Sequence, residues 1–453
     1  MLEVEREEIP TPRALRAVPG TSLDDLDLER VNDYIQHLNW PVRVETLKAD
    51  LESARQFLER RQLVRDGEVT QLGLLVAGPQ PEAYLGARSK VRLETLAGTN
   101  EFTGSLVPVL EASLTSLLRL MRTAPGATEA EVVPVPDEVL RQAVHNAIAH
   151  RDYTVNKPTT LHVSASGEVT LSHPGRFSPQ LLLASADPAF PLRGILPAID
   201  PPNPWLTGVL HVFRKWDGRR VGTTTLLHHC LTEQLDLPFY QVEQGEVGLT
   251  LRAGTLLDPA MEARLHSMDA YLESRNGGQA LTREQQLVLA YLMNSEWAHR
   301  RGQYTLLLTA ESPLFADVLG LARAGLVVPH PNGTTERPLF VPHRLLMQRE
   351  FPNELEARLG PVVQELSDPN RKLLSEVYRQ EAFSKSKSAT ASRTALCLWS
   401  EHRAGLREAG DPEPFQEQIR RGFNRLKRAG LLVRAPHGRG YVLNGEYGKG
   451  RLF

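Results

Sequence analysis

Three polar side chains recur four residues apart in the segment 142–150: Gln142, Asn146 and His150. In an α-helix this spacing places them along one side. Apolar residues at helical spacing indicate that another side of the same helix is packed: Leu140, Ala143, Ala147 and Ile148. A polar stripe of this kind either binds a ligand or faces water, and the spacing alone leaves both open.

Charged residues predict the two ends of this helix. Asp137 is expected to be its N-cap, with Glu138 in the first turn. At the other end His150, Arg151 and Asp152 are expected to have mainly structural roles, because a charged pair there can meet exposed carbonyls and hold the next loop.

A second candidate site is the basic segment 415–445. It carries seven cations and one acid, Glu417, for a net charge of +6 in a chain whose formal charge is −2. Phe415, Ile419, Phe423 and Leu426 recur at the spacing of a buried helical stripe. The opposite face therefore presents cations, and a short β-ribbon is expected to follow the helix.

A helix with exposed Arg and Asn fits the major groove of DNA, where Arg pairs with guanine and Asn with adenine. The expected DNA contacts are Arg420, Arg421, Asn424, Arg425 and Arg428 on the helix and Arg434 and Arg439 on the ribbon. The alternative is a charged face that simply meets water. The helix predicted over 313–324 has no net charge, so a basic face is not general in this chain.

The composition limits the class of protein. The 453 residues include 52 basic and 54 acidic side chains, which excludes a globally basic nucleic-acid binder. Cys230 and Cys397 are far apart and outside any CxxC pattern, so buried thiols in a reducing cytosol are expected. The acidic N-terminus lacks an apolar signal region, and no apolar run reaches membrane-spanning length, so a soluble cytoplasmic protein is expected.

The periodicities predict an α/β (α+β) chain with several units. After an irregular lead-in over 1–21, a small α/β unit is expected over 22–126, with helices at 26–38, 47–58 and 106–120 and strands at 73–78 and 90–98. Residues 127–255 are expected to form a layered α/β sandwich with two strands at 159–175, a helix at 205–213 and a closing strand at 246–254. Residues 278–347 and 367–446 each read as three helices and a β-ribbon, the pattern of two tandem winged helices.

Five motifs, in this order, resemble the GHKL-type ATP-binding transcriptional regulators that are often labelled RecG-like. They are QLGLLVAGP (71–79), RQAVHNAIAHRDY (141–153), HPG (173–175), PNPWL (202–206) and GTTT (222–225). The resemblance covers about residues 22–255 and implies a GHKL-like sandwich. The Schlafen-type module that often precedes it in the family is not recognisable ahead of residue 22.

The resemblance implies that Asn146 would ligate Mg²⁺ between ATP phosphates and that position 142, a Glu in the family, would orient water. Gln142 cannot accept a proton there. His173, before Pro174 and Gly175, stands where the family holds adenine. Gly222, Thr223 and Thr224 replace a Gly-Thr-Gly phosphate turn, so ATP and Mg²⁺ are expected to bind weakly or not at all. If a nucleotide binds, the resemblance implies that the residues around it are Gln142, Asn146, His150, His173, Gly175, Gly222 and Thr223.

The leading hypothesis is a homodimeric regulator that binds double-stranded DNA, with the GHKL-like half as a scaffold for ligand sensing or dimerisation. An ATP-dependent enzyme acting on DNA and a protein–protein adaptor are the alternatives. A P-loop helicase is excluded, because no GxxxxGKS/T sequence is present.

Overall fold

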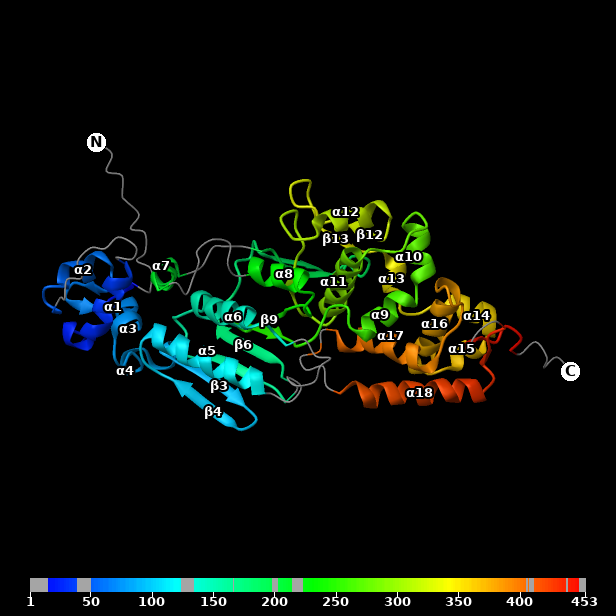
Figure 1. The fold of residues 1–453 in the computed structure, drawn as a ribbon, viewed down its shortest axis with the longest axis horizontal. Helices are drawn as coiled ribbons and strands as arrows, with labels where there is room; N and C mark the ends of the chain where they lie inside the picture. The colour runs from blue at the N-terminus through cyan, green and yellow to red at the C-terminus, as the bar shows by residue number, and fades with distance from the viewer. Residues whose placement is uncertain are drawn as a thin grey trace.

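The computed structural model describes residues 15–38, 50–123, 134–165, 167–197, 203–213, 223–404, 406, 411–436 and 439–447. The fold mixes α and β structure, as expected, with helices and several small sheets following one another along an elongated molecule (Figure 1). None of the described helices combines the length and the apolarity needed to cross a membrane.

The N-terminal part consists of short elements. They are α1 (Leu28–Leu38), α2 (Arg55–Arg60), the hairpin β1 (Val64–Arg65) and β2 (Glu68–Val69), α3 (Gln71–Ala77) and α4 (Glu82–Leu85). The segment 73–78 was predicted as a strand, and that prediction is wrong: Thr70 caps α3 by accepting from the Gly73 N–H at 3.1 Å. The helix predicted over 47–58 lies partly outside the described residues, and α2 covers its end.

A six-stranded sheet is the centre of the fold, in the order β4-β3-β5-β6-β10-β9. Its strands are β3 (Val91–Thr95), β4 (Gly98–Phe102), β5 (Thr159–Val163), β6 (Val169–Pro174), β9 (Phe239–Glu243) and β10 (Glu246–Leu251). Only the pairing of β3 with β5 is parallel. The predicted boundary at 126/127 is therefore corrected, because strands from both sides of it share this sheet.

Helices cover one face of this sheet: α5 (Leu106–Thr123), α6 (Asp137–His150) and α8 (Thr223–Thr232) (Figure 1). Leu161, Val169 and Leu171 point into the resulting core, while the residues between them carry polar side chains on the other face. The predicted N-cap of α6 is wrong by one residue. Asp137 is the first helical residue, and Pro136 precedes it without a side-chain cap.

A three-stranded sheet joins two of the predicted units. It contains β7 (Leu182–Ser185), β8 (Leu192–Ile195) and β11 (Thr305–Leu306), and β11 pairs parallel with β8. The helix α7 (Pro204–Val212) follows β8 in the chain, close to its predicted position. Residues 278–347 therefore belong to the same body as the central sheet.

The predicted helices and ribbon of 278–347 are present and follow α9 (Pro259–His266) and α10 (Asp269–Arg275). They are α11 (Arg283–His299), α12 (Phe315–Arg323), β12 (Val327–Pro329) and β13 (Phe340–Pro342), followed by α13 (Arg344–Met347). Their buried side chains continue the core that begins at Leu15.

The last part of the chain has a core of its own, from Leu355 to Leu443. Its elements are α14 (Pro352–Leu359), α15 (Val362–Glu365), α16 (Asp368–Phe383), α17 (Ala391–Arg403), α18 (Pro412–Arg428), β14 (Leu432–Arg434) and β15 (Tyr441–Leu443). Ala389 forms a single antiparallel bridge to Tyr441 at the edge of the ribbon. Three helices and a ribbon thus occur where the second winged helix was expected.

Candidate functional site

A cavity of about 370 Å³ lies between α6 and the inner face of the central sheet. Its walls are mostly apolar, with a few polar groups among them. The lining residues include Asn146 and His150 from α6, His173 from β6, Thr223 from α8 and Tyr240 from β9. A concave apolar site with few polar groups is the usual form of a small-molecule site.

The structure brings together four of the seven residues predicted for nucleotide binding: Asn146, His150, His173 and Thr223 line the cavity. Gly175 packs against His173 and the His150 carbonyl without lining the cavity, and Gln142 does not line the cavity either. Gly222 lies outside the described residues. Of the three residues of the predicted polar stripe, Asn146 and His150 therefore line the cavity, and Gln142 does not.

Asn146 carries the clearest unmet bonding capacity at the cavity. Its Oδ1 is buried and accepts no hydrogen bond from any residue that the structure describes. A buried acceptor without a donor costs free energy, so a ligand donor or a cation at this oxygen would be favourable. By contrast, Gln142 donates from Nε2 to Glu138 Oε1 at 3.0 Å and is tied to its own helix. The role that the resemblance implies for position 142, close to a bound phosphate, does not fit this placement.

His173 is held as an acceptor. Its Nδ1 lies 3.0 Å from the Pro174 carbonyl oxygen, which can only accept, so Nδ1 carries the proton and Nε2 presents a lone pair. Burial lowers the pKa of His173 to about 4, which keeps the ring neutral near pH 7. The tautomer that adenine-type recognition would require is thus the one that the backbone selects.

Gly175 is required for close packing behind this imidazole. Its φ is +154°, and a Cβ there would lie 3.2 Å from His173 Nδ1 and 3.3 Å from the carbonyl oxygen of His150. A larger residue would therefore push on two lining residues at once.

The residues after the polar stripe organise the end of α6, as expected. Arg151 is buried, and its guanidinium donates to Thr159 Oγ1 at 3.1 Å and to the Lys157 carbonyl. The Asp152 N–H donates to Pro174 O at 2.7 Å. Asn203 donates to the carbonyls of Ala149 and Arg151 at 2.8 and 2.9 Å, so this side chain caps the C-terminal end of α6. Burial also lowers the pKa of His150.

Several lining residues were missed by sequence reasoning. Arg176, Phe177 and Ser178 follow the HPG motif, and Leu181, Ile195, Leu196, Tyr240, Val247 and Leu249 complete the wall. Arg176 is exposed and is the only formally charged side chain among the described lining residues. Its position directly after the motif was the one available signal.

The described residues fit an ATP-type ligand only in part. The unpaired Asn146 oxygen and the His173 acceptor suit a cation and an amine donor. No cluster of three His, Cys, Asp or Glu side chains suited to a metal ion occurs among the described residues. Asn146 would hold Mg²⁺ and His173 the base if a nucleotide bound. Of the phosphate turn, Gly222 lies outside the described residues, and Thr223 and Thr224 begin α8.

Two buried histidines predict a pH-dependent stability. Burial lowers the pKa of His173 to about 4 and that of His299 to about 3, from 6.5 in the unfolded chain. Below pH 6.5 the unfolded chain binds protons that the folded chain does not, so the free energy of unfolding falls as pH decreases toward 4. Each histidine contributes about 1.4 kcal/mol per pH unit in this window.

His299→Gln should remove one of these contributions, as measured by denaturant unfolding of both proteins between pH 6.5 and 5. A constant difference across this range would contradict the prediction.

The second candidate site is the exposed side of α18. Phe423 and Leu426 are buried in the C-terminal core, while Arg421, Asn424, Arg425 and Arg428 are exposed. The helix packs on α17, which in turn packs on α9, so α18 lies on the outer side of the C-terminal helices (Figure 1). The predicted division of its faces is confirmed for the second half of the helix, whereas Phe415, Ile419 and Arg420 in the first half are half-buried. Contact with DNA remains a prediction.

The cations of α18 differ in their partners. Arg420 Nη1 lies 3.1 Å from Glu413 Oε1, and Arg421 Nε lies 2.9 Å from Glu417 Oε1. Both are therefore partly neutralised within the helix. Arg425 and Arg428 form no ion pair among the described residues. We expect these two to dominate any contact with an anion.

The β-ribbon extends this basic end of the helix. Arg434 and Arg439 are exposed, and Lys427 lies over the ring of Tyr441 at 5.0 Å. Between residues 424 and 441 the sequence holds five cations and no carboxylate. The exposed cations of the second half of α18 and of the ribbon are Arg425, Lys427, Arg428, Arg434 and Arg439, and they are called the basic surface below.

Comparisons with known proteins leave the family open. The chain matches no protein-family model and no curated protein. It is similar to the crystal structure of the DIP2311 protein from Corynebacterium diphtheriae, with a TM-score of 0.40 and 15% sequence identity over 95% of this chain and 70% of that chain. A likeness at this level assigns neither a family nor a function.

Proposed function

We propose that this protein is a cytoplasmic DNA-binding regulator that contacts duplex DNA through the basic surface and holds a small ligand in the GHKL-like cavity. The observation that carries the proposal is the separation of faces on α18. One face builds the C-terminal core, and the other exposes Asn424, Arg425 and Arg428 beside the cationic ribbon. This arrangement suits phosphate contacts by Arg and base contacts by Arg or Asn.

A homodimer is part of the proposal, because two copies of one basic helix would read two half-sites of a symmetric operator. Titration of a labelled duplex with the full-length protein tests the function. Saturable binding that weakens with salt supports it. Absence of binding at low salt would refute it and favour a protein–protein adaptor.

Nucleotide binding without turnover is the second candidate function, favoured by the unpaired Asn146 oxygen and the acceptor form of His173. We expect ATP to bind weakly and phosphate release to stay at background, because Gln142 is bonded to Glu138 and lies off the cavity. For the same reason Gln142→Glu should not raise turnover.

Thermal shift with ATP, with and without Mg²⁺, and a phosphate-release assay measure these outcomes. Asn146→Leu should remove whatever shift the wild-type protein shows, since the lost contact is worth about 1–3 kcal/mol. His162→Leu on the outer face of the same sheet is the matched control and should leave the shift unchanged. Steady phosphate release by the wild-type protein would show that an active enzyme is the better description.

A further inference from the structure

The C-terminal unit, residues 351–447, meets the rest of the chain mainly through polar groups. The body, residues 15–347, has one extended apolar core and a small separate cluster around Leu192 and Leu307, and the C-terminal unit has a core of its own. Among the described residues of the unit, Ala404 is buried in the core of the body and Phe383 borders it. The backbone passes from body to unit once, through residues 348–350. Helix α17 packs closely on α9, and the rings of Tyr271 and Phe383 lie 5.8 Å apart across the interface, but neither contact merges the two cores.

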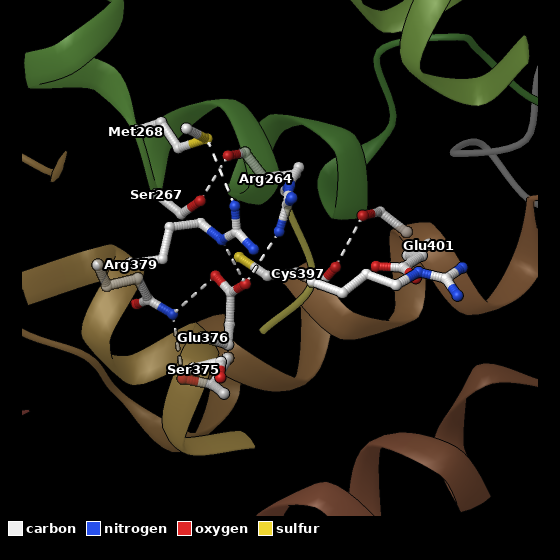
Figure 2. A network of polar contacts seen from close by, with 12 residues as sticks. Arg264, Ser267, Met268, Ser375, Glu376, Arg379, Cys397 and Glu401 are labelled. Carbon is white, nitrogen blue, oxygen red and sulfur yellow. Dashed lines mark hydrogen bonds and ion pairs between the residues drawn. The ribbon is translucent and has the colours of Figure 1, made fainter. Parts of the chain in front are cut away.

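A buried ionic cluster stands at this interface (Figure 2). Glu376 of α16 places Oε2 2.9 Å from Arg264 Nη1 on α9 and 3.0 Å from Arg379 Nε on its own helix. The side chains of Arg264, Glu376 and Arg379 are each only 2% exposed. Two cations and one carboxylate are thus held together out of water.

The two guanidinium groups also bind backbone carbonyls in α13 and in the connection. Arg264 Nη2 donates to the Leu346 carbonyl at 2.9 Å, and Arg379 Nη2 donates to the Gln348 carbonyl. Burial lowers the pKa of Arg379 to about 10, and the group stays charged near neutral pH. Helix α9, helix α16 and the connection between body and unit therefore meet at one ionic cluster.

A second set of polar contacts holds the end of α17. Arg301 of the body donates to the carbonyls of Ala404 and Glu401, and Arg252 donates to the carbonyl of Arg403 at 3.4 Å. Cations are favourable at the C-terminus of a helix, where carbonyls lack partners. Arg403 in turn pairs with Asp258, the N-cap of α9, at 3.0 Å.

Such an interface has different energetics from an apolar core. Desolvation offsets much of the attraction within a buried ion pair, so its net stabilisation is small, but removal of one partner leaves an uncompensated buried charge. The geometry of the pair is also directional. An interface of this kind favours one orientation strongly and contributes little to the folding of either side.

We propose that the Arg264–Glu376–Arg379 cluster is the docking contact of a separately folded C-terminal unit, and that it fixes the direction in which the basic surface faces. Loss of the cluster frees α17 from α9 and lets the unit move about the connection at 348–350, while the core of the unit stays folded. The proposal does not depend on DNA binding, because docking is measured without DNA.

Hydrogen exchange of full-length Glu376→Gln tests the proposal. Exchange in α9 and α17 should rise by about a hundredfold or more, the effect expected when one member of a buried ionic cluster is removed. Exchange in α18 and the ribbon should stay as slow as in the wild-type protein, because their core is separate. Unchanged protection in α9 and α17 overturns the proposal, and so does loss of protection throughout residues 351–447.

Two further variants complete the test. Glu273→Gln breaks the Lys385–Glu273 pair, which spans the same interface at 2.9 Å with half of the Lys385 side chain exposed, and it should leave exchange unchanged. The triple variant Arg264→Met, Glu376→Leu, Arg379→Met replaces the cluster by apolar groups of similar size. It should restore wild-type protection of α9 and α17. If the triple variant exchanges as fast as Glu376→Gln in these helices, the cluster is not the docking contact.

Discussion

Replacement of Arg425 and Arg428 together by alanine is expected to lower the affinity for duplex DNA by about a hundredfold at low salt. Both side chains are exposed and form no ion pair among the described residues, so their charge is available to phosphate. Each lost phosphate contact should also flatten the dependence of log K on log salt by about 0.9. Fluorescence anisotropy at several salt concentrations measures both quantities.

Arg323→Ala is the matched control for this variant. Arg323 is exposed in the last turn of α12, the helix of the body that corresponds to α18 in the predicted tandem arrangement, and α12 has no net charge. Its replacement should leave affinity and salt dependence unchanged. Equal losses from Arg323→Ala and from the double variant would show that binding is nonspecific and does not use α18.

Gly73→Ala is expected to destabilise the body by about 3 kcal/mol, at the upper end of overpacking effects. A Cβ at Gly73 would lie 2.1 Å from the carbonyl oxygen of Leu63 and 2.8 Å from Val69 Cγ1. The Leu63 oxygen cannot move away freely, because it accepts from the Thr70 N–H at 2.9 Å. Helix α3 and the β1–β2 hairpin would have to separate.

Gly208→Ala provides the comparison, since Gly208 is also inside a helix, α7, with nothing within 4 Å of the added Cβ. This variant should be more stable than the wild-type protein by about 0.5–1 kcal/mol, through helix propensity alone. Denaturant unfolding of both variants measures the two changes in the free energy of unfolding, which should have opposite signs. Similar effects of the two substitutions would contradict the close approach at Gly73.

The polar stripe of α6 could be predicted from sequence because helical spacing is a local property. Asn146 and His150 stand four residues apart and line the same cavity. Residues 73–78 were assigned to a strand because every residue of α3 is buried, and a helix without a polar side has no period of 3.6. The spacing signal is lost when all faces are packed.

Pairings between distant segments were not predictable. The parallel pairing of β3 with β5 joins residues 91–94 to 159–162, and β8 pairs with only two residues of β11. No local pattern records either contact, so the predicted boundary at 126/127 fell within one sheet. For the same reason Tyr240 could not be assigned to the cavity from its own neighbours.

The sequence composition predicts which face of α18 is charged, but it does not predict which of the arginines on that face form ion pairs. The net charge of segment 415–445 and the apolar stripe predicted the outer side of α18 correctly. The pairing of Arg420 with Glu413 and of Arg421 with Glu417 depends on side-chain rotamers. Because these two arginines are partly neutralised, Arg425 and Arg428 are the arginines of α18 that remain for an anionic ligand. The ribbon then extends that charge in the same direction.

The salt dependence of duplex binding by the full-length wild-type protein tests the central claim most directly. With five cations and no carboxylate between residues 424 and 441, the slope of log K against log salt should lie between about −3 and −5. Anisotropy titrations of one labelled duplex at four or more salt concentrations give this slope. A slope near zero, or no binding at low salt, would contradict the account of α18 and its ribbon as a DNA-binding surface.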